Sequence, residues 1–406
     1  MTRAASVINR CRALAAMSET SDGLLRTFLS PPMRDAHRLL TQWMEAAGMR
    51  VNVDAAGNLR GVYPASHEPS RRLLLGSHLD TVPNAGAFDG VLGVVLAIAL
   101  VEELRGRNLP FSIEIAAFSD EEGVRFGIPF LGSRALVGSL DAATLESRDA
   151  AGVSVADAIR AFGLDPPRLP EASLDPSVFA YVEFHIEQGP ALESLDLPLG
   201  VVTSIVGQSR STVIFRGQQD HAGTTPMALR RDALAVAARW IVDVERHARA
   251  VDGLVATVGS LDVRPGADNC IPGEVRASLD VRHPDDLIRR ASTGALLRAA
   301  HMAGERRGIG VECRSRMDQS AVSCDPALVG AMSRAVAAAG FPVNLMPSGA
   351  GHDGMILAAR APISMLFLRS PGGLSHHPDE AVNVCDVDAA LSVGLALLGE
   401  LETARP

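Results

Sequence analysis

Three short apolar runs of this chain are each followed, within a few residues, by a histidine or a pair of acidic residues. They are Leu73–Leu75 before His78, Ser112–Phe118 before Glu121 and Glu122, and Tyr181–Phe184 before His185. Such runs predict buried strands, and strands that alternate with helical segments predict an α/β fold. Ligands of open α/β sheets bind beyond the carboxyl ends of the strands. The pattern therefore predicts a layered α/β domain with a site at neighbouring strand ends.

The size and charge of the chain narrow the choice of function. A length of 406 residues, of which 47% are hydrophobic, exceeds what one core usually supports and predicts two domains. The formal net charge of −9, without a long run of lysine or arginine, argues against binding to nucleic acid. A small molecule is the expected partner.

Cysteine usage and hydropathy suggest where the protein works. The five cysteines are scattered and form no Cys-x-x-Cys pair, which predicts free thiols in a reducing compartment. The apolar run Val91–Val101 is too short to cross a bilayer, and no leader-like stretch follows the arginines near the N-terminus. We expect a cytoplasmic protein without a membrane partner.

The periodicity divides the chain into a first domain and an insertion. Helices are predicted at 34–48, 91–104 and 327–339, and buried strands at 73–75, 112–118, 181–184 and 363–368, with a hairpin at 56–58. Half-exposed strands at 211–216, 254–263 and 274–281, with helices at 228–250 and 285–304, predict an inserted α+β domain with an antiparallel sheet. The expected domains are a catalytic domain at 1–206 and 319–406, with a mostly parallel sheet, and an insertion at 207–318.

His78, Asp80 and Asp89 have metal-site character. His78 and Asp80 are two residues apart in an extended segment, so the Asp80 carboxylate is expected to accept the second N–H of the His78 ring and fix its tautomer. Asp89 has two oxygens that can bridge two cations. It also precedes a predicted helix, where an aspartate commonly serves as N-cap, and this alternative stays open.

The adjacent Glu121 and Glu122 are expected to have different roles. Consecutive residues at the end of an extended strand point to opposite sides, so one glutamate is expected to bind metal and the other to reach a water activated by the metal ions. A carboxylate beside that water can take its proton and pass it to a leaving nitrogen. The alternative is a solvated acidic strand end.

Polar residues of the insertion suit substrate binding. His221 lies in Asp-His-Ala-Gly-Thr-Thr-Pro, Asn269 lies in a loop, and Arg282 ends a strand. Arginine can bind a carboxylate with two hydrogen bonds, asparagine can bind an amide or ureido group, and histidine can face a developing oxyanion. Taken singly, each is also common in turns or on surfaces.

Seven motifs spread over most of the chain resemble one enzyme family. They are Gly76-Ser-His-Leu-Asp-Thr81, Phe88-Asp-Gly90, Asp120-Glu-Glu-Gly-Val-Arg-Phe126, Phe184-His-Ile-Glu-Gln-Gly-Pro190, His221-Ala-Gly-Thr-Thr-Pro-Met227, Gly351-His-Asp353 and Leu374-Ser-His376. They resemble the amidase branch of the di-metal aminoacylase and carboxypeptidase superfamily, which comprises N-carbamoyl-L-amino-acid hydrolases, allantoate amidohydrolases and β-ureidopropionases. Histidine at 185, where the peptidases carry an acidic residue, points to the amidase branch.

The resemblance implies specific roles at the metal site. His78 and His185 are expected to bind one metal ion, Glu122 and His376 the other, and Asp89 both, with Glu121 as general base and Asp80 supporting catalysis. Because His377 follows His376, the ligand could be displaced by one residue, and His376 is preferred because it directly follows Ser375. Two divalent ions per subunit are expected, drawn from zinc, manganese, cobalt and nickel.

The resemblance also implies how substrate is bound. The substrate contacts are expected to be Gln188, His221, Asn269, Arg282, Gly351 and His352. The insertion is expected to be a lid and to form a homodimer, with His221 acting in its own subunit or in the partner's. Val124 departs from the pattern, because many relatives carry a small polar residue there.

The expected reaction is hydrolysis of the terminal C–N bond of a ureido acid, which yields an amine, ammonia and carbon dioxide. Allantoate is the leading substrate, because Asp120–Phe126 followed by Leu-Gly-Ser-Arg134 resembles relatives assigned that substrate. N-carbamoyl-L-amino acids come a close second. The alternatives are an N-acyl amino acid deacylase or peptidase, and a non-catalytic binding protein that kept the fold.

Overall fold

The computed structural model describes residues 2–403, and the chain divides into two compact units. The first unit runs to Thr203 and resumes at Cys324, and the second unit comprises Ser204–Ser323. Within the described residues, no helix is both long and apolar enough to span a bilayer. All five cysteines are free thiols, as expected.

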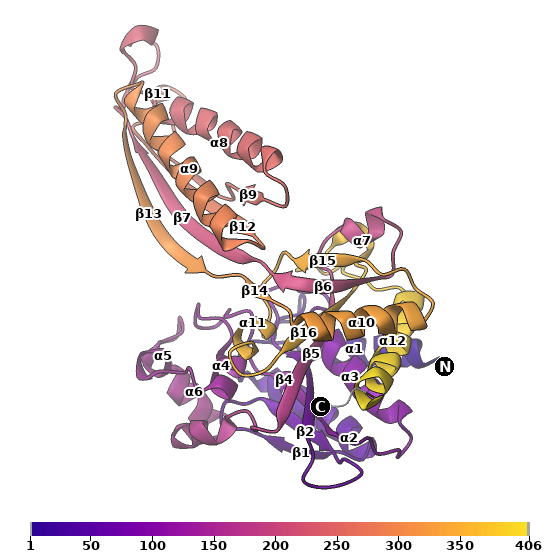
Figure 1. Cartoon of the computed structure of the whole chain (residues 1–406). Coiled ribbons are helices and arrows are strands. Elements are labelled where there is room, and N and C mark those ends of the chain that lie inside the picture. Colours follow the sequence, from indigo (N-terminus) through magenta and orange to yellow (C-terminus); the bar gives the residue numbers. More distant parts are fainter. Residues whose placement is uncertain (1, 404–406) are drawn as a thin grey trace. The chain divides into compact units, whose positions relative to one another are not determined.

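A nine-stranded mixed sheet carries the first unit (Figure 1). Its order is β1-β2-β4-β3-β5-β16-β6-β14, with β15 beside β6, and β4, β3, β5 and β16 run parallel. The strands are β1 (Arg50–Val53), β2 (Leu59–Tyr63), β3 (Arg72–His78), β4 (Ser112–Phe118), β5 (Val178–Ile186), β6 (Leu199–Ile205), β14 (Val322–Ser323), β15 (Leu345–Ser348) and β16 (Ile363–Leu368). The α/β prediction with a parallel centre is confirmed.

Helices cover this sheet. They are α1 (Arg3–Ala15), α2 (Pro31–Ala46), α3 (Val91–Glu103), α4 (Leu131–Val137), α5 (Ala142–Glu146), α6 (Val155–Ala161), α7 (Ala191–Ser194), α10 (Pro326–Ala338), α11 (Gly354–Leu357) and α12 (Val384–Thr403), with 3₁₀ turns η1 (Pro166–Ala172) and η3 (Pro371–Gly373). All residues of α3 from Val91 to Val101 are buried, because the helix packs between the sheet and helices α1 and α12. A helix that is apolar all round belongs in such a core.

The second unit is a five-stranded antiparallel sheet with two long helices on one face (Figure 1). Its elements are β7 (Gly207–Arg216), β8 (Asp220–His221), η2 (Met227–Leu229), α8 (Ala233–Ala250), β9 (Val255–Thr257), β10 (Leu261–Arg264), β11 (Cys270–Ile271), β12 (Glu274–His283), α9 (Asp286–Glu305) and β13 (Gly310–Gln319). Strands β8 and β11 form a separate two-stranded sheet. Alternate residues of β12 are buried, which gives the sheet one face against α8 and α9 and one polar face. The antiparallel α+β prediction is confirmed.

Two predicted elements of the second unit were wrong. The single strand predicted at 254–263 is two strands, β9 and β10, which pair with different parts of β12. The helix predicted from 228 begins at Ala233, because Asp232 caps it by accepting a hydrogen bond from the backbone N–H of Ala235. The edge strand β13 was not predicted.

Candidate metal centre

The candidate metal ligands gather where the parallel strands of the first unit end. His78 is the last residue of β3, His185 lies near the end of β5, and Glu121 and Glu122 follow β4. Because β3 lies between β4 and β5, these ends are neighbours. The connection to α3 adds Asp89, and the segment after η3 adds His376.

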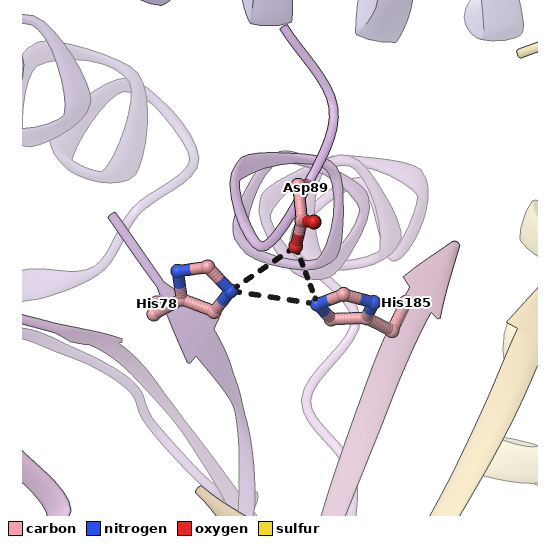
Figure 2. A group of neighbouring side chains, drawn as sticks. All are labelled: His78, Asp89 and His185. Atoms are coloured by element: carbon pink, nitrogen blue, oxygen red, sulfur yellow. Dashed lines mark hydrogen bonds and ion pairs between the residues drawn. The ribbon is translucent and has the colours of Figure 1, made fainter. Parts of the chain in front are cut away.

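One group consists of His78, Asp89 and His185 (Figure 2). Asp89 Oδ1 lies 3.4 Å from His78 Nε2 and 3.2 Å from His185 Nε2, and the two nitrogens lie 3.5 Å apart. The Nδ1 atoms lie 3.0 Å from the carbonyl oxygen of Asp80 and 2.9 Å from that of Ile186. A carbonyl only accepts, so each Nδ1 carries a hydrogen and each Nε2 is the nitrogen that can bind a cation.

A second group uses the other oxygen of Asp89. His376 Nε2 lies 3.4 Å from Asp89 Oδ2 and 3.2 Å from Glu122 Oε1. Asp89 therefore has one oxygen in each group, the arrangement that a bridging carboxylate requires. His377 is not part of the group, since its Nδ1 lies 3.8 Å from the carboxylate of Asp379.

Electrostatics and donor chemistry fit divalent cations at these two groups. Asp89 Oδ1 is buried and accepts no hydrogen bond. Burial and repulsion from neighbouring carboxylates raise the pKa of Asp120, Glu121 and Asp353 well above the usual values. Hydrogen bonds to Asp89 and Glu122 raise the pKa of His376 to about 10. A bound cation would stabilise the ionised carboxylates, and the nitrogen and oxygen donors of the site suit zinc, manganese, cobalt or nickel.

Asp80 has contacts besides the predicted one. His78 Nδ1 lies 3.0 Å from the Asp80 carbonyl oxygen and 3.5 Å from its carboxylate Oδ1. The carboxylate also accepts the backbone N–H groups of Glu121 at 2.9 Å and Glu122 at 3.0 Å. Asp80 therefore connects the end of β3 to the bend after β4, and its hydrogen bonds fix the backbone positions of both glutamates.

The expectation that Glu121 and Glu122 point to opposite sides was wrong. Oxygens of both side chains lie within 4.8 Å of each other and of a nitrogen of His78. The extended-strand argument fails because β4 ends at Phe118 and the chain bends before the glutamates. Both carboxylates therefore reach the same centre, with Glu122 alone also near His376.

Asp89 does not cap α3, the alternative that the sequence left open. The N-cap residue is Gly90, and no side chain caps the helix. Gly90 has φ +67°, and a Cβ atom there would lie 2.5 Å from the His78 ring. Only glycine can adopt this backbone conformation and also allow that close approach. Gly90 in Phe88-Asp-Gly90 therefore lets the His78 ring lie against the start of α3.

The structure places three of the expected substrate contacts close to the metal ligands. Gln188 donates from Nε2 to Asp89 Oδ2 at 2.8 Å, and its buried Oε1 has no donor. A Cβ atom on Gly351 would lie 3.9 Å from Glu121 Oε1, so that backbone borders the glutamate. His352 is buried with its ring 4.6 Å from that of His185, and burial together with the charge of His185 lowers its pKa well below the usual value.

The other expected contacts belong to the second unit. Pairing of β8 with β11 sets His221 opposite Cys270, and the N–H of Ala222 bonds the carbonyl of Asn269 at 2.9 Å. His221 Nδ1 accepts the N–H groups of Gly223 at 3.0 Å and Thr224 at 3.3 Å, so in the neutral ring Nε2 carries the hydrogen. That nitrogen is a donor, the property an oxyanion contact requires.

Arg282 lies on the polar face of β12. Its Nε donates to Asp280 Oδ1 at 2.9 Å, and its Nη2 donates to Asp280 Oδ2 at 3.3 Å. Arg210 and Gln208, on the neighbouring strand β7, donate to the same Asp280 Oδ2. The Asp280 carboxylate thus takes the Nε and Nη2 donors of Arg282 and fixes the guanidinium.

Several residues of the site escaped the sequence analysis. Glu183 lies on the same face of β5 as His185, fully buried, and accepts hydrogen bonds from Ser77 at 3.1 Å and Tyr181 at 2.8 Å. A buried glutamate two residues before a ligand candidate is a signal that strand alternation could have given. Ser375 and Glu380 also contact the Asp89 segment, and nothing local in the sequence signals this.

The chain is similar to known proteins of one family. The model of Peptidase family M20/M25/M40 matches residues 74–401. Allantoate deiminase 1 of Glycine max is 41% identical, with 97% of this chain and 88% of the relative covered. N-carbamoyl-L-amino acid amidohydrolase of Geobacillus stearothermophilus is also 41% identical, with 89% of each covered. A solved amidase of the hydantoinase/carbamoylase family from Burkholderia multivorans has a TM-score of 0.92 at 31% identity, covering 98% of this chain and 97% of that one.

Proposed function

Since the chain belongs to Peptidase family M20/M25/M40 and its curated relatives hydrolyse allantoate or N-carbamoyl-L-amino acids, we propose that it releases ammonia from a ureido acid with the help of divalent metal ions. The enzyme is a hydrolase of non-peptide C–N bonds in linear amides. The observation that carries the metal-dependent proposal is the Asp89 carboxylate, with one oxygen facing His78 and His185 and the other facing His376.

The proposed reaction breaks the terminal C–N bond of R–NH–CO–NH₂. Water adds to the ureido carbon, ammonia leaves, and the carbamate R–NH–COOH then separates into the amine R–NH₂ and carbon dioxide. His78, His185, Glu122, His376 and Asp89 would hold divalent ions, which would supply Lewis acidity and lower the pKa of water. Glu121 takes the proton of the attacking water and gives it to the leaving nitrogen.

Substrate recognition is assigned to polar groups of both units. Arg282 binds the carboxylate of the substrate, Asn269 and Gln188 bind its ureido group, and the Nε2–H of His221 faces the oxygen that gains charge. Gly351 and His352 border the substrate beside Glu121. The support for these roles is the family resemblance and the donor character of His221 Nε2.

Allantoate is the leading substrate and N-carbamoyl-L-amino acids are the second candidate. Relatives named for each are 41% identical to this chain, so overall similarity does not rank them. The ranking rests on the segment Asp120–Phe126 and its continuation to Arg134. The test offers purified, metal-loaded protein allantoate, N-carbamoyl-L-amino acids, N-carbamoyl-β-alanine and an N-acetyl amino acid, and measures ammonia from the ureido compounds and acetate from the N-acetyl compound. Cleavage of the N-acetyl compound alone would instead support a deacylase.

We further propose a homodimer formed through the second unit, with that unit serving as a lid. Support comes from the resemblance and from β13, which lies at the edge of its sheet and, within the described residues, pairs with β7 alone. Light scattering coupled to size-exclusion chromatography tests the dimer. A mass of one chain at working concentration would contradict it.

A further inference from the structure

One buried carboxylate interrupts an otherwise solvent-facing segment. Among the described residues 371–385, only Glu380 is buried, at 6% exposure. Its Oε1 accepts the backbone N–H groups of Phe88 at 2.8 Å and Asp89 at 3.0 Å. A carboxylate removed from water is costly unless it is hydrogen-bonded, so its placement on the backbone that carries Asp89 calls for an explanation.

The absence of a side chain at Gly86 leaves room for the Glu380 carboxylate. A Cβ atom on Gly86 would lie 2.3 Å from Glu380 Cβ and 2.6 Å from Oε1. Any larger residue at position 86 would push Glu380 away from the N–H groups of Phe88 and Asp89. The approach therefore depends on both partners, Gly86 in the turn and Glu380 in the segment.

The same segment contacts the side chain of Asp89. The Ser375 hydroxyl donates to Asp89 Oδ2 at 2.6 Å, and His376 Nε2 lies 3.4 Å from that oxygen. Asp89 is thus held at its backbone by Glu380 and at its carboxylate by Ser375. No side chain caps α3, so no capping hydrogen bond at the start of the helix holds this segment in place of these contacts.

We propose that Glu380 is a positioning residue of the metal centre, which fixes the backbone of Asp89 so that its two oxygens face the two ligand groups. Groups that orient a ligand in this way commonly change metal affinity about 10- to 100-fold when removed. The proposal concerns metal binding by the resting protein. It is independent of the substrate, so it can fail while the proposed function stands, and the reverse also holds.

The test measures cobalt affinity of the full-length protein by competition with a chromophoric chelator. Glu380→Ala removes the acceptor, Glu380→Gln keeps an acceptor oxygen, and Gly86→Ala displaces Glu380 without altering it. Asp379→Asn is the matched control, since it changes a neighbouring acidic residue whose side chain is 81% exposed. The visible spectrum of bound cobalt reports the ligand geometry, and the melting temperature of the stripped protein reports folding.

Glu380→Ala and Gly86→Ala are expected to weaken cobalt binding about 10-fold or more and to alter the cobalt spectrum. Glu380→Gln should recover most of the affinity, and Asp379→Asn should match the wild type. If Glu380→Ala does not fold, the cobalt affinity and spectrum of Gly86→Ala decide whether Glu380 positions the metal centre. Lower melting temperatures with unchanged affinity and spectrum in the variants that fold would reduce Glu380 to a structural contact and overturn the proposal.

Discussion

At the scale of single residues, the centre contains several buried carboxylates. Asp89, Glu121 and Asp353 are each buried, and Glu121 and Glu122 lie beside His78. Such a set costs free energy in the metal-free protein and gains it on binding a cation. Removal of single members should therefore separate chemistry from metal binding.

Glu121→Gln tests the assigned base. The amide cannot take a proton from water, so kcat should fall about 10²- to 10⁴-fold, while bound metal stays near the wild-type amount because five other ligand candidates remain. Ammonia release and metal analysis on the same sample provide the measurement. Glu45→Gln, at an exposed position on α2, is the control. Turnover of Glu121→Gln near that of the control would remove Glu121 from the mechanism.

The buried His37 should make the folded protein less stable in mild acid. Burial, with added repulsion from Arg26 and Arg34, lowers the pKa of His37 to about 4 from the usual 6.5. The unfolded chain therefore takes up a proton below pH 6.5, while the folded chain does so only near pH 4. The free energy of unfolding should fall by about 2 kcal/mol between pH 7.5 and pH 5 through this residue alone.

The measurement compares thermal unfolding at pH 7.5 and pH 5. His37→Leu removes the titrating group, so the melting temperature of this variant should fall less on acidification than that of the wild type. His67→Leu, at an exposed position, should keep the wild-type difference. Equal acid sensitivity of His37→Leu and His67→Leu would contradict the assignment.

The ligand candidates could be predicted from the sequence because each lies at a strand end or in a short motif. His78, Glu122 and His185 follow apolar runs, and the structure brings them to one place. The contacts of Asp80 with the backbone of Glu121 and Glu122 could not be predicted, because they depend on the bend after β4. Glu380 could not be predicted either, since it meets Asp89 across 291 residues.

At the scale of elements, buried strands were predicted more accurately than exposed ones. The bounds of β4 and β16 are those predicted, Ser112–Phe118 and Ile363–Leu368, because a fully buried strand is a mostly apolar run. The edge strand β13 was missed because its side chains are largely exposed and charged, without a clear apolar alternation. The break between β9 and β10 follows from pairing with β12, which is not a local property.

Packing of α3 on β5 allows a test at this scale. A Cβ atom on Gly93 would lie 2.2 Å from the carbonyl oxygen of Phe184. Gly93→Ala should therefore lower the free energy of unfolding by about 1–3 kcal/mol through overpacking. Gly399→Ala, on an exposed part of α12 with nothing near the added atom, should be neutral or stabilising by up to about 1 kcal/mol. Equal stability of both variants, measured by urea unfolding, would contradict this packing.

At the scale of the whole molecule, the candidate metal ligands and part of the proposed substrate contacts belong to different units. All candidate metal ligands belong to the first unit, whereas His221, Asn269 and Arg282 belong to the second. Variants of the second unit should therefore alter substrate affinity without altering metal content. This separation distinguishes recognition from catalysis in measurements on the intact enzyme.

Arg282→Ala tests the separation. Loss of a charged hydrogen-bond donor should raise KM about 10- to 100-fold, with bound metal unchanged. Arg276→Ala is the matched control, because Arg276 lies on the same face of β12 and donates to Glu274 as Arg282 does to Asp280. An unchanged KM in Arg282→Ala would remove this residue from substrate binding.

The most direct test of the account is a metal titration of turnover. Chelator-stripped protein receives increasing amounts of manganese, cobalt or zinc, and ammonia release from the preferred ureido acid is followed. We predict no turnover without metal and a rise that levels off at two ions per subunit, with Asp89→Ala remaining inactive throughout. Full turnover by stripped protein that holds no measurable metal would contradict it.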